Sequence, residues 1–304
     1  MAQRAATGGV SLRASGAVAR RQAVSRLSRY ALLAASLVGV GILILLGVET
    51  IIQGGDRISW AFVTNYPSRF ADQAGLRSSI LGTFWVMGAT IALAFPIAIG
   101  TAIWMEEFAP RNFLLTVVKL NLANLAGVPS IIYGILGLTL FVRFLELGPA
   151  IIAGAMTLAL MIIPMTVIAS QEAIRQVPPS TREGSLALGA THWQTVWYHV
   201  LPGAMPGIMT GIILATSRAI GETAALIMIG AFTFIAYDNA SFFPPQDSSL
   251  FEDFTTVPIQ IYNWTIRPQE AFRQNAAAAI ILLMVAVVGL NLIAALIRER
   301  FRRD

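Results

Sequence analysis

The sequence contains no cysteine and few charged residues. Of its 304 residues, 12% are charged and 56% are hydrophobic, whereas a soluble domain carries about 25% charged residues. Without cysteine the chain cannot be a disulfide-stabilised scaffold, and the apolar excess excludes an intrinsically disordered chain. The remaining class is an integral membrane protein, provided that the apolar residues occur in runs of about 20.

Residues that carry catalysis or bind metals are also scarce. The only histidines, His192 and His199, lie two helical turns apart with no carboxylate between them, so we expect no metal site. Lys119 is the only lysine, and no G-x-x-x-x-G-K-[S/T] phosphate loop occurs, so nucleotide hydrolysis by that route is excluded. No Ser-His-Asp or paired-carboxylate arrangement falls in one predicted cavity. We therefore expect neither catalysis nor a cofactor in this chain.

Long apolar runs are present. Each run is long enough, at 1.5 Å per residue, to cross about 30 Å of hydrocarbon as an α-helix. None alternates with a period of two over ten residues, as the strands of a membrane β-barrel would. The sequence therefore predicts an all-α polytopic membrane protein with six transmembrane helices. These spans cover residues 31–52, 80–104, 114–140, 150–169, 207–234 and 276–297.

The arginines indicate how the spans are oriented. Segment 1–30 contains six arginines and no acid, and segment 298–304 contains four arginines. Because Lys and Arg concentrate in cytoplasmic segments, both tails are predicted to be cytoplasmic, flanking a transmembrane domain over 31–297. The loop 170–206 is then internal, and the loop 235–275, with five acids against two arginines, is external.

The N-terminal segment has other readings. Its arginine-rich, serine-containing and acid-free composition also fits an organellar transit peptide or the charged start of a signal peptide. No A-x-A-like cleavage site followed by a polar mature start comes after the first apolar run, which favours a plain cytoplasmic tail. Nucleic-acid binding has neither aromatic nor motif support.

The internal loop 170–206 is the most informative stretch. Its Pro178-Pro179 pair should end the preceding helix. Ser180 and Glu183 have the spacing of a capping box, which predicts a short cytoplasmic helix after the prolines. Gly189 then suits the left-handed position that follows the end of a helix.

A second short helix is predicted after Gly189. Thr191 and Gln194 again have capping-box spacing, and Leu201-Pro202 should end the helix. Its apolar residues, at helical spacing, are Trp193, Val196, Trp197 and Val200. The tryptophans could lie at the lipid interface, where Trp is favoured, or the helix pair could dock into a groove of a partner protein.

The same loop resembles the coupling-loop motif of ABC importer permeases. That motif reads Glu-Ala-Ala, three residues, Gly, nine residues, and Ile-x-Leu-Pro. Here two small residues replace the alanines and His199 replaces the isoleucine. The residues that match by position are Glu183, Gly184, Ser185, Gly189, Leu201 and Pro202. The resemblance implies that this loop docks onto separate ATPase subunits, which hold the ATP and Mg²⁺.

Two further segments are similar to phosphate-specific permeases. They are 124–134 (NLAGVPSIIYG) and 218–223 (RAIGET), and the similarity extends from the second span to the sixth. Of the two permease subunits in that importer, the pattern looks like the A subunit (PstA type). The resemblance implies a bacterial inner-membrane importer of inorganic phosphate with a second, C-type permease, two ATPase subunits and an external phosphate-binding protein. The external loop, including 242–245 (FFPP), is a plausible contact for that binding protein.

Arg218 and Glu222 lie deep inside the predicted fifth span. A charge at mid-bilayer costs about 2.5–3.5 kcal/mol, so each needs a partner or a watery cavity. At i and i+4 they would share one helix face, which allows a purely structural salt bridge. Alternatively, the Arg218 guanidinium binds an oxyanion through its planar set of N–H donors, and Glu222 lowers the affinity of Arg218 for that anion. Thr223 and Tyr133 could add hydroxyl donors to the same substrate pathway.

The residues alone leave other transport functions open. One arginine does not choose among oxyanions, so sulfate and molybdate are alternatives to phosphate. An ion-gradient-driven secondary transporter would use Glu222 as its titrating group, but such carriers often have repeated halves, which the sequence does not show. A membrane anchor or sensory subunit without a pathway would leave the buried charges unexplained.

Overall fold

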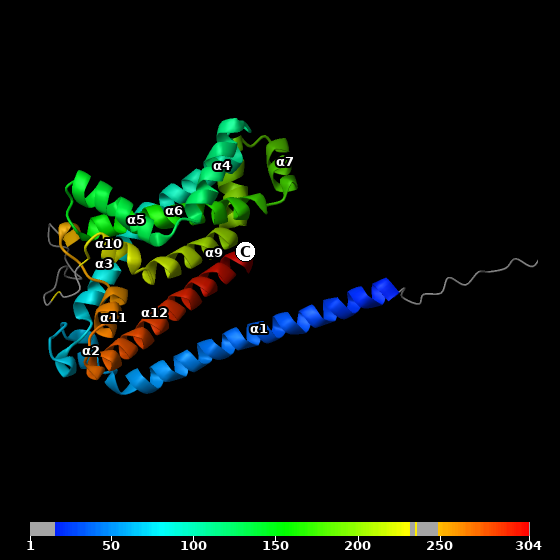
Figure 1. Cartoon of the computed structure of the whole chain (residues 1–304). Helices are drawn as coiled ribbons and strands as arrows, with labels where there is room; N and C mark the ends of the chain where they lie inside the picture. Colours follow the sequence, from blue (N-terminus) through cyan, green and yellow to red (C-terminus); the bar gives the residue numbers. More distant parts are fainter. Residues whose placement is uncertain (1–15, 232–234, 236–248, 304) are drawn as a thin grey trace, which may run out of the picture. The chain divides into compact units, whose positions relative to one another are not determined.

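The computed structural model describes residues 16–231, 235 and 249–303 (Figure 1). The regular structure of these residues is helical, and the only β-type pairing among them is an isolated bridge between Ala150 and Asp253. The chain forms two compact units, Met1–Ile52 and Gln53–Asp304. The predicted all-α fold is therefore confirmed.

The first unit is built on the helix α1 (Gly16–Gly54). Its 39 residues correspond to about 58 Å at 1.5 Å per residue, more than the roughly 30 Å of hydrocarbon in a bilayer. Residues 16–30, predicted as part of a tail, are thus continuous with the first span. Arg4 and Arg13 lie outside the described residues.

The second unit contains all the remaining elements. Its α-helices are α2 (Trp60–Thr64), α3 (Arg77–Ile103), α4 (Phe113–Ala126), α5 (Ser130–Gly137), α6 (Ile151–Arg175), α7 (Pro179–Ala187), α8 (His192–Thr195), α9 (Leu201–Ile220), α10 (Ala224–Met228), α11 (Val257–Thr265) and α12 (Glu270–Arg303). Three π-helical turns, η3 (Trp104–Phe108), η4 (Leu138–Phe144) and η5 (Val196–Val200), continue α3, α5 and α8. Short 3₁₀ turns are η1 (Gly55–Arg57), η2 (Ala71–Gln73) and η6 (Ser249–Phe251).

Five helical segments of the described chain are long and apolar enough to cross a membrane. They are Arg20–Arg57, Arg77–Phe108, Ile151–Arg175, His192–Ile220 and Glu270–Arg300. The pair formed by Phe113–Ala126 and Ser130–Phe144 passes the same test jointly. The six predicted spans are therefore present if this bent pair counts as one.

The third span is broken near its middle. Its two segments, on either side of Pro129, are bent by 101°. The span predicted over 114–140 is therefore not one continuous helix, because proline lacks an N–H and disfavours helical geometry at the residue before it. Pro129 itself has extended geometry (ψ 140°) and immediately precedes α5.

The fifth span begins much earlier than predicted. One helical segment runs from His192 to Ile220, so it passes through Pro202, where the cytoplasmic helix was expected to end. The π-turn η5 accounts for this continuity: the Leu201 N–H donates to the Val196 carbonyl, five residues back. The wider turn accommodates a proline that cannot donate a backbone hydrogen bond.

The fifth span also ends earlier than predicted. The helix α9 stops at Ile220, Gly221 follows, and the short α10 begins only at Ala224. Residues 232–234, the last part of the predicted span, lie outside the described chain. The apolar run therefore contains a helix break that its hydropathy does not reveal.

The core of the second unit is a stack of helices that pack closely along their lengths. The most extensive packing joins α3 to α6 and α6 to α9, and α12 lies against α9 and α11 (Figure 1). Small residues such as Ala94, Ala98 and Ala215 are fully buried here, which lets the backbones approach closely. This packing fixes the position of α9 relative to α3, α6 and α12.

Part of the predicted external loop belongs to this core. The side chains of Phe254 and Trp264 are fully buried, and α11 packs on α3 and α12. The loop 235–275 is thus not one extended surface segment, because its second half folds back onto the spans. Residues 242–245, predicted to contact a binding protein, lie outside the described residues.

Gly134 is a point of close contact between α5 and α10. A Cβ there would lie 2.7 Å from the Ala225 carbonyl oxygen and 2.8 Å from the Ala225 Cα, which are backbone atoms. We expect Gly134→Ala to lower the free energy of unfolding by about 1–3 kcal/mol, as overpacking does. Thermal unfolding of the detergent-solubilised protein measures this effect.

Gly100→Ala is the matched control, because a Cβ at Gly100 of α3 meets open space. That variant should gain up to about 1 kcal/mol, since alanine is the better helix former. Equal melting temperatures for the two variants would contradict the close contact at Gly134.

Candidate functional site

The predicted membrane charges do not pair with each other. Arg218 lies in the last turn of α9, whereas Glu222 lies beyond the end of that helix. Within the described chain, no ion pair joins them, and the Arg218 Nη1 contacts only the Met165 sulfur, at 3.8 Å. The prediction that both share one helix face was wrong because the helix ends at Ile220.

Glu222 stabilises the break between α9 and α10. Its Oε1 accepts a hydrogen bond from the Ala225 backbone N–H at 3.2 Å, so the carboxylate caps the start of α10. Thr223, half-buried beside it, contacts the Gly221 carbonyl through its hydroxyl at 3.5 Å. Arg218 is left as an exposed guanidinium without an acidic partner among the described residues.

Tyr133 is held inside the protein. Its side chain is buried, and its hydroxyl donates to the Leu125 carbonyl at 2.8 Å, across the break between α4 and α5. This carbonyl lies in the last turn of α4, where the regular helical acceptor pattern ends. The hydroxyl that was expected to point into the substrate pathway thus stabilises the broken span.

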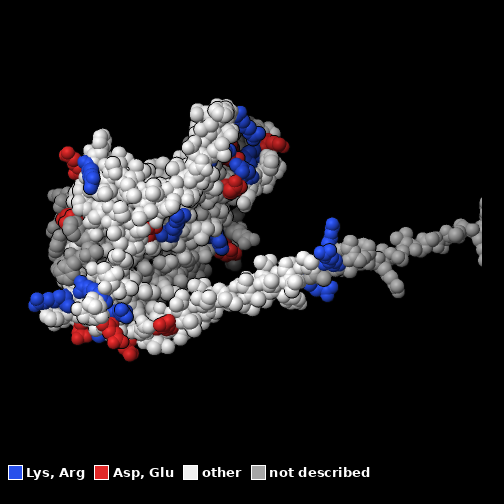
Figure 2. Space-filling view, in the orientation of Figure 1, with Lys and Arg blue, Asp and Glu red and all other residues white. Residues whose placement is uncertain are grey.

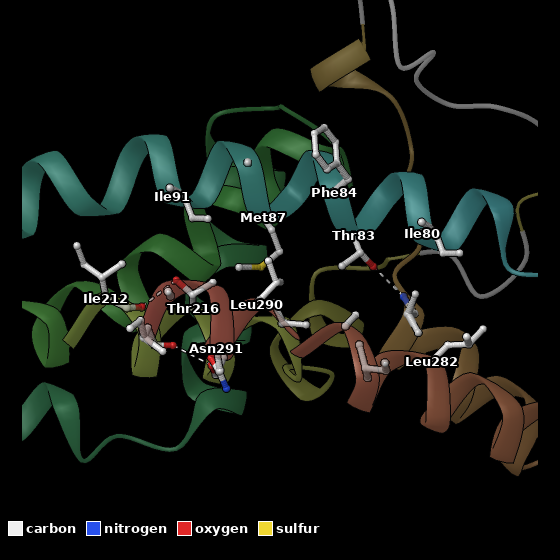
Figure 3. Close-up of a pocket in the computed structure, with 18 of the residues that line it drawn as sticks. Ile80, Thr83, Phe84, Met87, Ile91, Ile212, Thr216, Leu282, Leu290 and Asn291 are labelled. Carbon is white, nitrogen blue, oxygen red and sulfur yellow. Dashed lines mark hydrogen bonds between the residues drawn. The ribbon is translucent and has the colours of Figure 1, made fainter. Parts of the chain in front are cut away.

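A cavity of about 610 Å³ lies between α3, α9 and α12 (Figure 3). The labelled Ile80, Met87, Ile212 and Leu290 form part of its apolar wall, and no charged side chain of the described residues lines it. Polar groups at its edge form hydrogen bonds with other residues of the chain. For example, the Ser217 hydroxyl donates to Asn291 Oδ1 at 2.5 Å. Such a wall does not favour a phosphate ion, because it offers no compensating charge.

The helix α7, predicted to be cytoplasmic, begins differently from the prediction. Pro178 occupies the position before the helix, and Pro179 is the first helical residue. The N-cap residue forms no side-chain hydrogen bond to the start of α7, so the prediction of a Ser180–Glu183 capping box was wrong. Proline suits the first helical position because its missing N–H would be unpaired there anyway. Gly189 has φ +87°, the left-handed geometry that was expected.

The second capping box is present. Gln194 N–H donates to Thr191 Oγ1 at 3.3 Å, and Thr191 N–H donates to Gln194 Oε1 at 2.8 Å. The apolar stripe that follows is divided between two environments. Val196 and Val200 are buried, whereas Trp193 and Trp197 are 60% and 51% exposed and stack with ring centroids 5.8 Å apart.

The helices α7 and α8, with the turn between them, form one unit that we call the α7–α8 pair. A buried hydrogen bond of 3.0 Å between the hydroxyls of Ser185 and Thr195 joins its two helices. Leu188, in the connecting turn, is 91% exposed and Tyr198 is 68% exposed. Of the other motif residues, Glu183, Gly184, Gly189 and Pro202 are exposed and Leu201 is half-buried. The pair therefore presents apolar surface that this chain does not cover.

The π-turn η3, which continues the end of α3, carries two glutamates that sequence reasoning missed. Glu107, with a side chain only 5% exposed, accepts hydrogen bonds from Arg182 Nη2 at 2.6 Å and Nε at 3.1 Å. Glu106 accepts from Arg175 Nε at 3.1 Å and lies 3.5 Å from Lys119 Nζ. Adjacent acids at the end of an apolar run are a signal for such a cluster, since charges there need partners.

Charged side chains are distributed unevenly over the second unit. On the face in Figure 2 many of them gather near the α7 end and near α2 and α5, and the surface between carries fewer charged side chains. This sparsely charged zone is the part that a lipid bilayer would surround. The α7–α8 pair thus belongs to a water-facing end.

An α-helical membrane core with a helical pair at one water-facing end is the architecture of a transporter permease. Residues 94–303 match the family "Binding-protein-dependent transport system inner membrane component", and the chain belongs to this family. It is therefore an integral membrane subunit of an ABC importer.

Relatives support the resemblance to PstA-type permeases. The chain is 32% identical over 246 residues to the probable ABC transporter permease protein YqgI of Bacillus subtilis, covering 79% of this chain and 84% of that protein. It is 32% identical over 232 residues to the phosphate transport system permease protein PstA 1 of Mycobacterium tuberculosis (strain H37Rv), covering 76% and 71%. It is 33% identical to the PstC permease of Haemophilus influenzae, covering 52% and 58%.

A solved structure supports the fold. A chain of a bacterial alginate ABC transporter, in complex with an alginate-bound periplasmic protein, matches with a TM-score of 0.63 and 18% identity. The match covers 91% of this chain and 96% of that chain. At this identity the likeness concerns the fold alone.

The hydrogen bond of Tyr133 gives a prediction that separates a structural role from a substrate-binding one. Tyr133→Phe removes the hydroxyl that bonds the Leu125 carbonyl, so we expect stability to fall by about 0.5–1.5 kcal/mol. The KM for the transported substrate should not change, because the hydroxyl is already occupied. Uptake kinetics and thermal unfolding of the same preparation test both statements, and a raised KM at unchanged melting temperature would contradict them.

Proposed function

We propose that the chain is the A-type permease subunit of an ATP-driven importer of inorganic phosphate. It forms half of the translocation pathway, together with a second, C-type permease subunit. Two cytoplasmic ATPase subunits drive the cycle, and an external phosphate-binding protein delivers the substrate. The subunit lies in the bacterial plasma membrane with both termini in the cytoplasm.

The observation that carries the assignment of an anionic substrate is the exposed guanidinium of Arg218. A cation in a membrane helix is costly unless it faces a water-filled pathway or an anion. Because Glu222 is engaged at the start of α10, it does not neutralise Arg218. A guanidinium presents a planar set of donors that matches the oxygens of phosphate.

The position of Arg218 supports the same assignment. It lies in the final turn of α9, beside the break at Gly221, and non-helical backbone at membrane depth is tolerated where it lines a watery cavity. Broken helices also form the substrate sites of many transporters. The relatives named as phosphate permeases favour phosphate over other oxyanions. Membership of the ABC importer family argues against a gradient-driven carrier that titrates Glu222.

The α7–α8 pair is proposed as the docking element for the ATPase. Its exposed Leu188 and Tyr198 offer apolar surface to a groove, while Ser185 and Thr195 keep the two helices in one arrangement. ATP-driven closure of the ATPases would displace this pair and the spans joined to it. Such a movement alternates access to Arg218 between the two sides of the membrane.

Replacement of Arg218 tests the pathway. Arg218→Ala should lower phosphate uptake by more than about tenfold, because hydrogen bonds to a charged group contribute about 1.5–3 kcal/mol. Assembly should be intact, since the guanidinium contacts only one sulfur atom in the described chain. Uptake of labelled phosphate, sulfate and molybdate by the reconstituted complex, with and without its ATPase, is the measurement.

Arg218→Lys serves as the control, because it keeps the positive charge but removes the planar N–H donors of the guanidinium. It should therefore show intermediate phosphate uptake. Normal phosphate uptake by a stably assembled Arg218→Ala complex would contradict the proposed site. Transport of sulfate or molybdate in preference to phosphate would support Arg218 as an oxyanion site. It would overturn the assignment of phosphate as the substrate.

Replacement of Leu188 tests the docking surface. Leu188→Asp should weaken association with the ATPase subunits, because a desolvated carboxylate would replace an apolar contact. The fold should not change, since Leu188 is 91% exposed. Co-purification with the ATPase measures association, and the melting temperature of the isolated subunit is the control. Undiminished co-purification would place the ATPase elsewhere.

A further inference from the structure

The adjacent glutamates at the end of α3 bind different parts of the chain. Glu106 accepts from Arg175 at the end of α6 and pairs with Lys119 of α4. These contacts join one membrane span to two others. Glu107 instead pairs with Arg182 of α7, so it joins α3 to the α7–α8 pair.

Glu107 contacts both helices of that pair. Its carboxylate accepts hydrogen bonds from both Nε and Nη2 of Arg182, and its backbone carbonyl accepts one from His192 Nε2 of α8 at 2.8 Å. The carboxylate also lies 4.0 Å from His192 Nε2. With the Ser185–Thr195 hydrogen bond between the two helices, these contacts close a ring of polar interactions from α3 through α7 and α8.

The guanidinium of Arg182 has little freedom to move. Besides Glu107, it donates to the Val177 carbonyl at 2.8 Å and to the Ile174 carbonyl at 3.0 Å. These carbonyls belong to the end of α6 and to the turn after it. Since the Glu107 side chain is almost fully buried, loss of the pair would leave an unpaired charge in a place with little water.

We propose that Glu107 is a positioning residue that transmits movement of the α7–α8 pair to α3. The chain connects the pair directly only to α6 and α9, whereas α3 lies about 70 residues earlier in sequence. Through Glu107, displacement at the ATPase reaches α3 as well, and α3 is packed along α6. This inference rests on the proposed ATPase docking, but not on the identity of the substrate.

The adjacent pair of glutamates supplies a matched comparison. In the assembled complex, Glu107→Gln should lower the number of substrate ions imported per ATP hydrolysed by about tenfold, in the range of coupling between sites. ATPase binding should persist, because the exposed docking surface is unchanged. Glu106→Gln, one residue away, should leave this ratio near normal, since Glu106 does not contact the α7–α8 pair. An equal fall in both variants, or in neither, would overturn the proposal.

A distance measurement tests the same connection without relying on transport. The sequence has no cysteine, so spin labels can be placed at Ser180→Cys of α7 and Ile97→Cys of α3 without background labelling of this chain. Both positions are exposed, and neither belongs to the proposed docking surface. With Glu107 intact, the distance distribution between the labels should be the same without nucleotide and with ATP. In Glu107→Gln it should broaden or shift on ATP binding.

Glu107→Asp, which keeps the charge, provides a second variant if Glu107→Gln does not fold, and it should show a smaller shift. A change in label distance in the otherwise unchanged protein would overturn the proposal, because α3 and the α7–α8 pair would then move separately. If phosphate is not taken up but the label distance stays constant, the assignment of phosphate as the substrate is contradicted. The proposed role of Glu107 between α3 and the α7–α8 pair is then still supported.

Discussion

Backbone hydrogen bonding inside a membrane is the constraint on which this structure depends. Hydrocarbon offers no water to an unpaired N–H or C=O, so a helix can break only where another group takes its place. At the break before α5, the Leu125 carbonyl accepts hydrogen bonds from the Val128 N–H and from the Tyr133 hydroxyl. At the break before α10, the Glu222 carboxylate bonds the Ala225 N–H. Two residues that resemble substrate ligands in the sequence thus hold the broken spans together, and Arg218 is left without an acid.

The sequence predicted the features that are encoded locally. Apolar runs identify the spans, Gly189 identifies a left-handed helix end, and Thr191 with Gln194 identifies a capping box, because each signal lies within a few residues. The end of α9 at Ile220 was missed because the apolar run continues beyond it. The Glu107–Arg182 pair was missed because 75 residues separate its partners, and no periodicity connects them.

The charged residues of the second unit differ in whether they form ion pairs between helices. At the end that carries the α7–α8 pair, Glu106 joins spans to one another, and Glu107 joins a span to that pair. Arg218, in the last turn of α9, joins no elements in this way, since no carboxylate pairs with it among the described residues. The paired charges therefore fix the geometry of the water-facing end, whereas the Arg218 guanidinium is left available to a ligand.

The continuity of the helix from His192 to Ile220 has a further consequence. The π-turn η5 joins α8 to the membrane helix α9 without a break, so the first turn of α8 and Arg218 lie on one continuous helical segment about 40 Å long. The number of residues between them sets the direction of Arg218 around this helix relative to α8. A single inserted residue would rotate Arg218 by about 100° relative to α8. The length of this segment is therefore constrained as strictly as the identity of any side chain in it.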